Sequence, residues 1–197
     1  MKKIFAILAA ALIIVGCTNT DKKGAEDNTA ENVGWLAITP EEIEGNFVQN
    51  MDDGMLLSAG VKDSMNTMAI GWGGLGKLWK RPTLTIYVSG SRYTHEFMEA
   101  NDYFTVCRFD STYHDKVLYM GQHSGRDTDK VKGSGLTLKF TDLGHPYYDE
   151  ANLVIECRLL YKDQIDAAQA PEDIAPMYKD AKPHTMYVGE IVNVLSK

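Results

Sequence analysis

The sequence predicts a mainly β fold, a barrel decorated with short helices. Many short segments rich in β-branched and aromatic residues are separated by tight turns, which is typical of barrels and sandwiches. Only a few stretches have helical spacing, and we find no internal repeat and no second domain. The folded part is expected to begin near Val33, which leaves roughly 165 residues, enough for one domain with its own core.

The N-terminus reads as a targeting segment. Met1–Lys3 is positively charged, and Ile4–Val15 is apolar but too short for a comfortable transmembrane helix. Gly16 and Cys17 end this run in a pattern that resembles a bacterial lipobox. We therefore predict a signal peptide over residues 1–16, lipidation of Cys17, and an extracytoplasmic, membrane-anchored lipoprotein. An ordinary secretory signal with an incidental cysteine is the alternative.

Residues 17–32 contain almost no apolar side chains, so we predict a flexible tether there and the folded domain over 33–197. The net charge of -7 argues against a nucleic-acid partner, which would require a basic face. Cys107 and Cys157 lie in apolar strand patterns. Export would permit a disulfide between them, and two buried thiols are the alternative. No C-x-x-C spacing is present, which argues against a dithiol redox motif.

The first half of the domain is predicted as one helix and three strands. Thr39, Pro40 and Glu42 form a helix start with a capping box, and the helix is expected to reach Gln49 and to bury Ile43, Phe47 and Val48. Two strands then form a tight hairpin, a glycine-rich loop follows, and a third strand comes after Pro82. The three strands are expected over Met55–Val61, Asn66–Trp72 and Thr83–Ser89, and the loop glycines are Gly71, Gly73, Gly74 and Gly76.

The second half alternates short helices with strands. Asn152–Asp163 is expected to be a central strand, because Leu153, Ile155, Cys157 and Leu159 share one face. The other expected elements are a helix over Thr94–Asn101, a strand over Tyr103–Phe109, a helix over Tyr113–Gln122, a strand over Leu136–Leu143, a loop over Ala167–Ala181 and a closing strand over Thr185–Leu195.

Two segments could bind an anion. Arg92 and Thr94 precede a helix, where a guanidinium, a hydroxyl and free N–H groups suit a phosphate. Ser124, Gly125 and Arg126 could form a second anion-binding turn. Thr94 as a simple cap and a solvated Ser-Gly-Arg loop are the alternatives. Asp127, Asp129 and Lys130 are expected to hold the loop by local hydrogen bonds.

Three segments together resemble the flavin reductase-like family of FMN-binding split barrels, which includes the flavoredoxins. They are Asn66–Thr94, the S-G-R-D-x-D-K run of Ser124–Lys130, and the final strand His184–Ile191. The resemblance implies a Greek-key split barrel, a homodimer, FMN near the subunit interface, and a phosphate held by the two anion-binding segments. The resemblance also implies that one strand lies beside the flavin; the alternative is that this strand is ordinary barrel wall. It implies that His184 lies near the flavin or the hydride donor; the alternative is a structural role for His184. The flavin-side residues are Asn66, Thr67, Met68, Ala69, Ile70 and Trp72.

The resemblance implies hydride or electron transfer at a bound flavin, with a small-molecule or protein electron donor. We expect no essential protein acid or base, because the cofactor carries that chemistry. NADH and NADPH are cytoplasmic, so export predicts slow or absent NADH turnover. A flavoredoxin-like carrier with a membrane or periplasmic electron donor and a NAD(P)H-dependent reductase both remain open. A non-catalytic module that binds flavin or another planar ligand is the alternative. The histidines show no metal spacing, and nucleophile-elbow, P-loop and Rossmann motifs are absent from the sequence.

Overall fold

The computed structural model describes residues 34–179 and 182–197. The predicted signal peptide, the lipidated Cys17, the tether and Val33 lie outside these residues. Among the described residues, no helix combines the length and the apolar character needed to cross a membrane.

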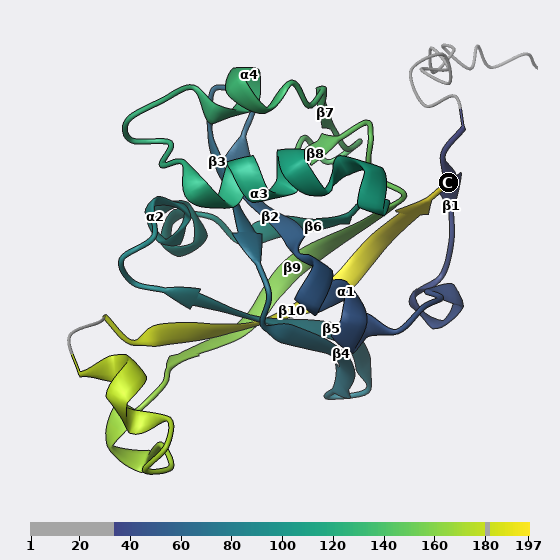
Figure 1. The fold of residues 1–197 in the computed structure, drawn as a ribbon. Coiled ribbons are helices and arrows are strands. Elements are labelled where there is room, and N and C mark those ends of the chain that lie inside the picture. The colour runs from purple at the N-terminus through teal and green to yellow at the C-terminus, as the bar shows by residue number, and fades with distance from the viewer. Residues whose placement is uncertain (1–33, 180–181) are drawn as a thin grey trace, which may run out of the picture. The chain divides into compact units, whose positions relative to one another are not determined.

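One antiparallel sheet dominates the described chain (Figure 1). Its strand order is β3-β2-β6-β9-β10-β5-β4, β1 pairs with β10, and β7 and β8 form a separate hairpin. The strands are β1 (Leu36–Ala37), β2 (Met55–Val61), β3 (Ser64–Ile70), β4 (Gly73–Leu78), β5 (Arg81–Ser89), β6 (Tyr103–Arg108), β7 (Leu138–Phe140), β8 (Pro146–Tyr148), β9 (Leu153–Gln164) and β10 (His184–Ser196). The predicted hairpin of the first two strands is confirmed as β2 and β3.

Short helices surround this sheet. They are α1 (Phe47–Asp53), α2 (Tyr93–Ala100), α3 (His114–Gln122) and α4 (Lys130–Ser134). Single 3-10 turns occur at Pro40–Glu42, Ser111–Tyr113, Ala167–Gln169 and Ala175–Tyr178. The last two turns belong to the connection between β9 and β10, which extends away from the sheet in Figure 1. The mainly β class with short helices is therefore confirmed.

The sheet curves around one apolar core. Ile70 of β3 and Ile86 of β5, near opposite ends of the strand order, both belong to this buried cluster. The predicted inward face of β9 is confirmed, because Leu153, Ile155, Cys157 and Leu159 all pack in it. Val154, on the opposite face, belongs to a second cluster beneath α3 and β8. Both faces of β9 are thus buried over residues 153–157, where the strand lies between β6 and β10, whereas most of its second half is exposed.

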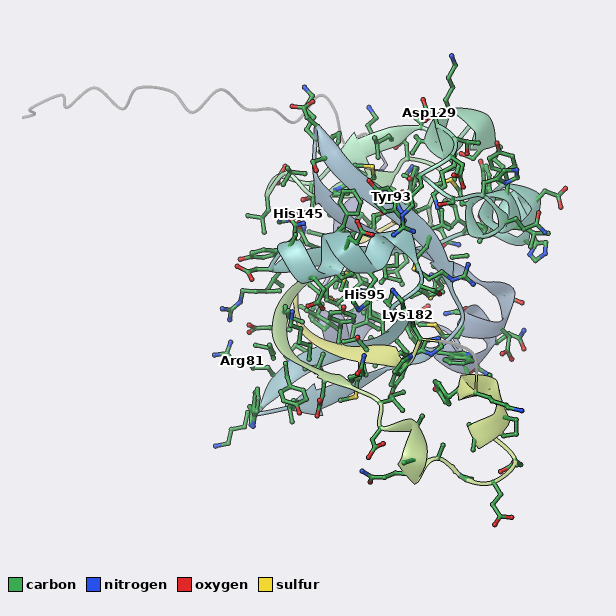
Figure 2. All side chains as sticks on the ribbon, turned by 90° about the vertical axis from the view of Figure 1, so that its left-hand side faces the viewer. Arg81, Tyr93, His95, Asp129, His145 and Lys182 are labelled. Atoms are coloured by element: carbon green, nitrogen blue, oxygen red, sulfur yellow. The ribbon has the colours of Figure 1, made fainter. Side chains whose placement is uncertain are left out.

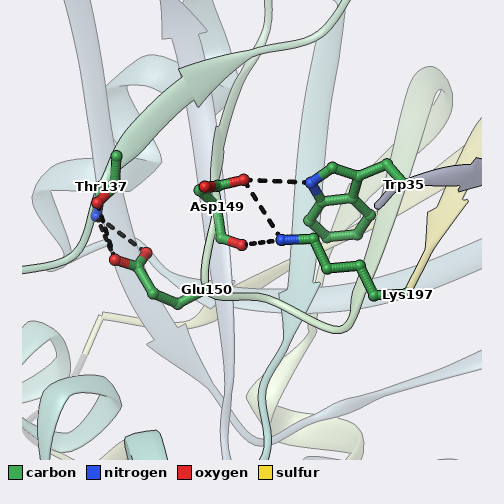
Figure 3. Close-up of polar contacts among 5 residues, drawn as sticks. All are labelled: Trp35, Thr137, Asp149, Glu150 and Lys197. Carbon is green, nitrogen blue, oxygen red and sulfur yellow. Dashed lines mark hydrogen bonds and ion pairs between the residues drawn. The ribbon is translucent and has the colours of Figure 1, made fainter. Parts of the chain in front are cut away.

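Contacts with Asp149 and Lys197 hold Trp35, at the start of the described region, in place (Figure 3). Trp35 donates its indole N–H to Asp149 Oδ1 at 3.3 Å, and Lys197 Nζ lies 4.2 Å from the centroid of the Trp35 ring. Next to Asp149, Glu150 accepts hydrogen bonds from the amide and hydroxyl of Thr137. These contacts secure β1 beside the end of β10.

The predicted helix from Thr39 to Gln49 is wrong as a single element. The capping box does form, because the Thr39 amide and hydroxyl donate to the Glu42 carboxylate at 2.7 and 2.9 Å. The chain then turns at Gly45, whose φ is +108°, and Asn46 caps α1 as a separate helix. Ile43 and Phe47 pack against the core as expected, whereas Val48 is 74% exposed.

The predicted glycine-rich loop is largely strand β4, which forms a hairpin with β5. Its two-residue turn is Trp79 and Lys80, with φ of +50° and +63°, where Asn or Gly is the usual signal. A Cβ on Gly73 would lie 2.5 Å from the Thr85 carbonyl oxygen, so this glycine permits close strand pairing. Strand β3 already ends at Ile70, which places Trp72 outside it.

The two remaining cysteines are free thiols. Both are buried, and they lie in different apolar clusters, Cys107 in the one beneath α3 and Cys157 in the core enclosed by the sheet. Burial raises the pKa of Cys107 to about 12 and raises that of Cys157 well above its usual range. The structure therefore supports the alternative of two buried thiols rather than a disulfide.

Replacing Gly60 with alanine is expected to destabilise the domain by about 1–3 kcal/mol. Gly60 has a φ of +106°, and a Cβ there would lie 2.1 Å from the Ser64 carbonyl oxygen. Gly74→Ala is the matched control, because a Cβ at Gly74 meets nothing within 4 Å. Urea unfolding measures both variants, and equal free energies of unfolding would contradict the expectation.

Candidate anion and planar-ligand site

Two adjoining cavities lie along β3: the first between β3, the start of α2 and the loop after α3, and the second between β3, the end of β5 and the start of β10. The first has a volume of about 180 Å³ and the second about 410 Å³. Met68, Ser91 and Arg92 line both cavities, so the two form one elongated site. Figure 2 views the molecule from the side on which α2 covers the sheet, with Tyr93 labelled at the start of that helix.

The structure brings together eleven of the twelve residues predicted from the sequence. The first cavity is lined by Asn66, Met68, Arg92, Thr94, Ser124, Gly125 and Arg126, and the second by Met68, Ala69, Ile70, Trp72, Arg92 and His184. Thr67 lines neither cavity. Its hydroxyl is buried on the other side of β3, 2.7 Å from Ser58 Oγ and 2.8 Å from the Tyr148 hydroxyl.

Thr94 joins α2 to β3. Arg92, not Thr94, is the N-cap residue of α2, so the alternative that Thr94 is a simple cap is wrong. The Thr94 hydroxyl is buried and accepts a hydrogen bond from Asn66 Nδ2 at 2.8 Å. This bond fixes the first turn of α2 beside the strand that lines both cavities.

The Ser-Gly-Arg loop packs directly on the same strand. A Cβ on Gly125 would lie 2.2 Å from Asn66 Oδ1, so only glycine allows this close approach. Arg126 forms an ion pair with Glu96, and its guanidinium lies 4.6 Å from the centroid of the Tyr93 ring. Both contacts hold the Arg126 side chain against α2.

Basic side chains line the first cavity, and no carboxylate lines it to offset their positive charge. Neither cavity is lined by an Asp or Glu residue. The Arg92 guanidinium forms no hydrogen bond or ion pair within the described part of the chain. Burial and Arg92 together lower the pKa of the Lys130 ammonium to about 8. An arginine with unused donors beside a buried lysine is well suited to an anion.

Lys130 holds the loop after α3, as the sequence predicted, but it also lines the first cavity. Its ammonium donates to the carbonyl oxygens of Met120 and His123 at 3.1 and 3.0 Å. Asp129 has a purely local role, because its carboxylate accepts from the Lys132 amide and caps α4. The lysine of the S-G-R-D-x-D-K run was the sequence signal for this cavity position.

Aromatic rings line part of the second cavity, with Trp72, Tyr87 and His184 among its lining residues. The Trp72 and His184 rings lie 4.6 Å apart between centroids, and Tyr178 meets His184 edge-on at 5.9 Å. His184 Nδ1 is buried and lacks a hydrogen-bond partner among the described residues. Burial and then Arg92 lower the pKa of His184, which favours the neutral ring. This end can accept a planar ligand that has a polar edge.

Sequence reasoning did not assign several other lining residues. They are Ser91, Tyr93, Gly121, Gln122, His123 and Lys130 in the first cavity and Gly71, Tyr87 and Ser89 in the second. Most flank predicted positions, and the end of α3 reaches the site only through tertiary packing. Within residues 34–179 and 182–197, no group of three or more His, Cys, Asp or Glu gathers as a metal site would require.

Comparisons with known proteins agree with this fold. The model of the flavin reductase like domain matches residues 55–197. A flavoredoxin structure from Methanosarcina acetivorans is 29% identical, with a TM-score of 0.59, and the match covers 73% of this chain and 68% of that one. The flavoredoxin of Desulfovibrio vulgaris (Miyazaki F) is 25% identical, with a TM-score of 0.58 and coverage of 73% and 69%.

An FMN-binding protein from Thermus thermophilus shares the fold at 21% identity, with a TM-score of 0.58 and coverage of 72% and 68%. No curated protein matches the chain. The family model spans well over half of the sequence, and the site lies within the matched region. The chain therefore belongs to the flavin reductase-like domain family.

Proposed function

We propose that this protein binds FMN and transfers hydride or electrons at the flavin, as a flavin reductase or a flavoredoxin-like carrier. One observation carries the proposal. Arg92, with no partner among the described residues, lies where a cation-lined cavity joins a cavity lined by aromatic rings. A phosphate linked to a planar ring system has the matching distribution of charge and apolar surface.

The residues present fit FMN in their donors and their shape. Arg92, Ser124, Lys130 and the start of α2 would hold the phosphate. The close packing of Gly125 on Asn66 shapes this end of the site.

At the other end, Met68, Ile70 and Trp72 offer apolar contacts for the isoalloxazine. Nδ1 of His184, which has no hydrogen-bond partner among the described residues, would offer a hydrogen bond to a polar edge of that ring system.

The bound flavin supplies the redox chemistry, and the chain supplies binding and orientation. Trp72 and His184 lie at the aromatic end, where they can shield one side of a bound ring from water. The lowered pKa of His184 keeps its ring neutral near neutral pH, so it would act there as a hydrogen-bonding group rather than a cation. We assign no acid or base of the chain to the reaction.

We also propose that the protein is a homodimer exposed outside the cytoplasm and attached to the membrane through Cys17. The lipobox-like segment supports this location, and the family resemblance supports the dimer. A membrane or periplasmic donor would then deliver electrons, because NADH is confined to the cytoplasm.

An FMN titration of the purified full chain, followed by flavin fluorescence, tests the proposal. We expect tight quenching that saturates near one FMN per chain. Absence of FMN binding would contradict the proposed function. FMN binding without electron transfer to the flavin from NADH, NADPH or a membrane or periplasmic donor would favour the non-catalytic binding module.

A further inference from the structure

The connection between β9 and β10 forms a small lobe beside the second cavity. The lobe comprises residues 165–179 and includes two 3-10 turns. Its Tyr178 ring meets the His184 ring edge-on at 5.9 Å, and His184 lines the cavity. The amide of Ile165 also donates to the His184 carbonyl oxygen at 2.9 Å. A protein bound to this lobe would therefore lie next to the aromatic end of the proposed flavin site.

The surface of the lobe is both apolar and acidic. Ile174 and Met177 are 39% and 51% exposed, and Trp72, at the neighbouring cavity, is 44% exposed. Glu172 and Asp173 directly precede Ile174, and no described residue forms a hydrogen bond or ion pair with their exposed carboxylates. Aromatic and methionine side chains are enriched at protein interfaces, and surrounding charges select a partner of the opposite sign. The lobe thus has the composition of a docking surface for a basic protein.

Negative charge predominates in the lobe and in the whole domain. Within the lobe, the exposed carboxylates of Asp166, Glu172 and Asp173 outnumber the one lysine, Lys179. Lys182, in the same connection, is also exposed. Residues 1–33 contain four lysines and four acidic residues, so the net charge of -7 belongs entirely to the rest of the chain. A basic partner is therefore attracted to the domain as a whole, and an acidic one is repelled.

The lobe and the start of the domain lie at opposite ends of β10. This strand runs for 13 residues from His184 to Ser196, which is roughly 40 Å along the strand, and β1 pairs with its far end. Figure 1 shows β1 and the lobe on opposite sides of the sheet. The connection from the proposed anchor at Cys17 reaches the domain beside β1. A soluble partner can therefore reach the lobe without approaching the point where the chain is attached.

We propose that the lobe of residues 165–179 is the docking surface for a soluble one-electron carrier with a basic surface, which exchanges electrons with the flavin in the second cavity. This inference rests on the proposed function. With a c-type cytochrome as the carrier, each reduced FMN loses two electrons to two ferric haems, which become ferrous, and two protons to water. Electron-transfer encounters bury less than about 1,200 Å² of surface, so a small lobe suffices.

The test measures binding of a soluble c-type cytochrome of positive net charge to the full chain by calorimetry, with and without FMN. The variant Glu172→Lys, Asp173→Lys is compared with the control Glu41→Lys, Glu44→Lys, which changes the same amount of charge at exposed positions between β1 and α1. At an ionic strength of about 0.1 M, charges act over roughly 10 Å, so the control should bind within about threefold of the wild type. The lobe variant should bind about 10-fold more weakly.

Electron transfer gives a second readout. The FMN-loaded chain is reduced with dithionite, freed of excess reductant and mixed with the ferric cytochrome in a stopped-flow instrument. We expect the second-order rate of haem reduction to fall about 10-fold in the lobe variant and to decrease with added salt in the wild type. An equal rate for the lobe variant and the wild type would overturn the inference.

Equal cytochrome affinity of the lobe variant and the control would also overturn the inference, as would a wild-type chain that does not bind the cytochrome. A change in the oligomeric state of the lobe variant, measured by sedimentation, would assign the lobe to contact with a second copy of the chain and overturn it too. If the lobe variant does not fold, the neutral variant Glu172→Gln, Asp173→Asn takes its place. Failure of the wild type to bind FMN would instead overturn the proposed function, because cytochrome binding to the FMN-free chain tests the lobe separately.

Discussion

Replacing Arg92 with methionine is expected to weaken FMN binding by about 1.5–3 kcal/mol. Arg92 lines both cavities, and no described residue forms a hydrogen bond or ion pair with its guanidinium, so we expect its donors to contact the ligand. It caps α2 only through its backbone, and the substitution should leave stability nearly unchanged. Isothermal titration calorimetry measures the effect, with Lys132→Met as the control for loss of a surface charge.

The position of Arg92 can also be tested without FMN, through the pKa of His184. Arg92 lowers the pKa of both His184 and Lys130, in each case after burial as the larger cause. Arg92→Met should therefore raise the pKa of His184 toward its ordinary value, which NMR of the histidine ring can follow. An unchanged FMN dissociation constant together with a raised His184 pKa would remove Arg92 from the phosphate site while confirming its position.

Replacing His145 with alanine is expected to destabilise the domain by about 3–5 kcal/mol. Glu156 of β9 is 1% exposed, and its carboxylate accepts hydrogen bonds from His145 Nδ1 at 2.6 Å and Thr141 Oγ1 at 2.5 Å. Asn193 Nδ2 adds a longer contact at 3.3 Å, and the Tyr103 ring stacks on His145. Losing the imidazole leaves a buried carboxylate with too few donors.

Arg81→Ala is the matched control, because Arg81 pairs with Glu190 at the surface and such pairs contribute about 1 kcal/mol or less. Figure 2 labels both Arg81 and His145. Urea unfolding gives the two free energies. The Glu156→Gln single variant and the Glu156→Gln, His145→Ala double variant then complete a double-mutant cycle that isolates the coupling between the pair. Similar losses for His145→Ala and Arg81→Ala would contradict the argument.

The strands were predictable wherever local pattern and packing agree. In β9 the alternation of apolar residues places Leu153 and Ile155 on the inner face, because side chains alternate along a strand. The pattern did not predict the helix break at Gly45 or the turn at Trp79 and Lys80. At the turn, the pairing of β4 with β5 imposes a positive φ on Trp79 and Lys80, which the local propensities of these residues do not predict.

The candidate site was likewise predictable in part from the sequence, and the rest depended on tertiary contacts. The sequence by itself determined the residue types: two arginines, a serine-glycine turn and a strand with a tryptophan, in an order that resembles one family. Only the tertiary structure decided that Thr94 bonds Asn66 rather than capping α2, and that Lys130 faces a cavity as well as its own loop. Those roles depend on contacts between residues far apart in the chain, where burial and charge are set by neighbours that local sequence does not specify.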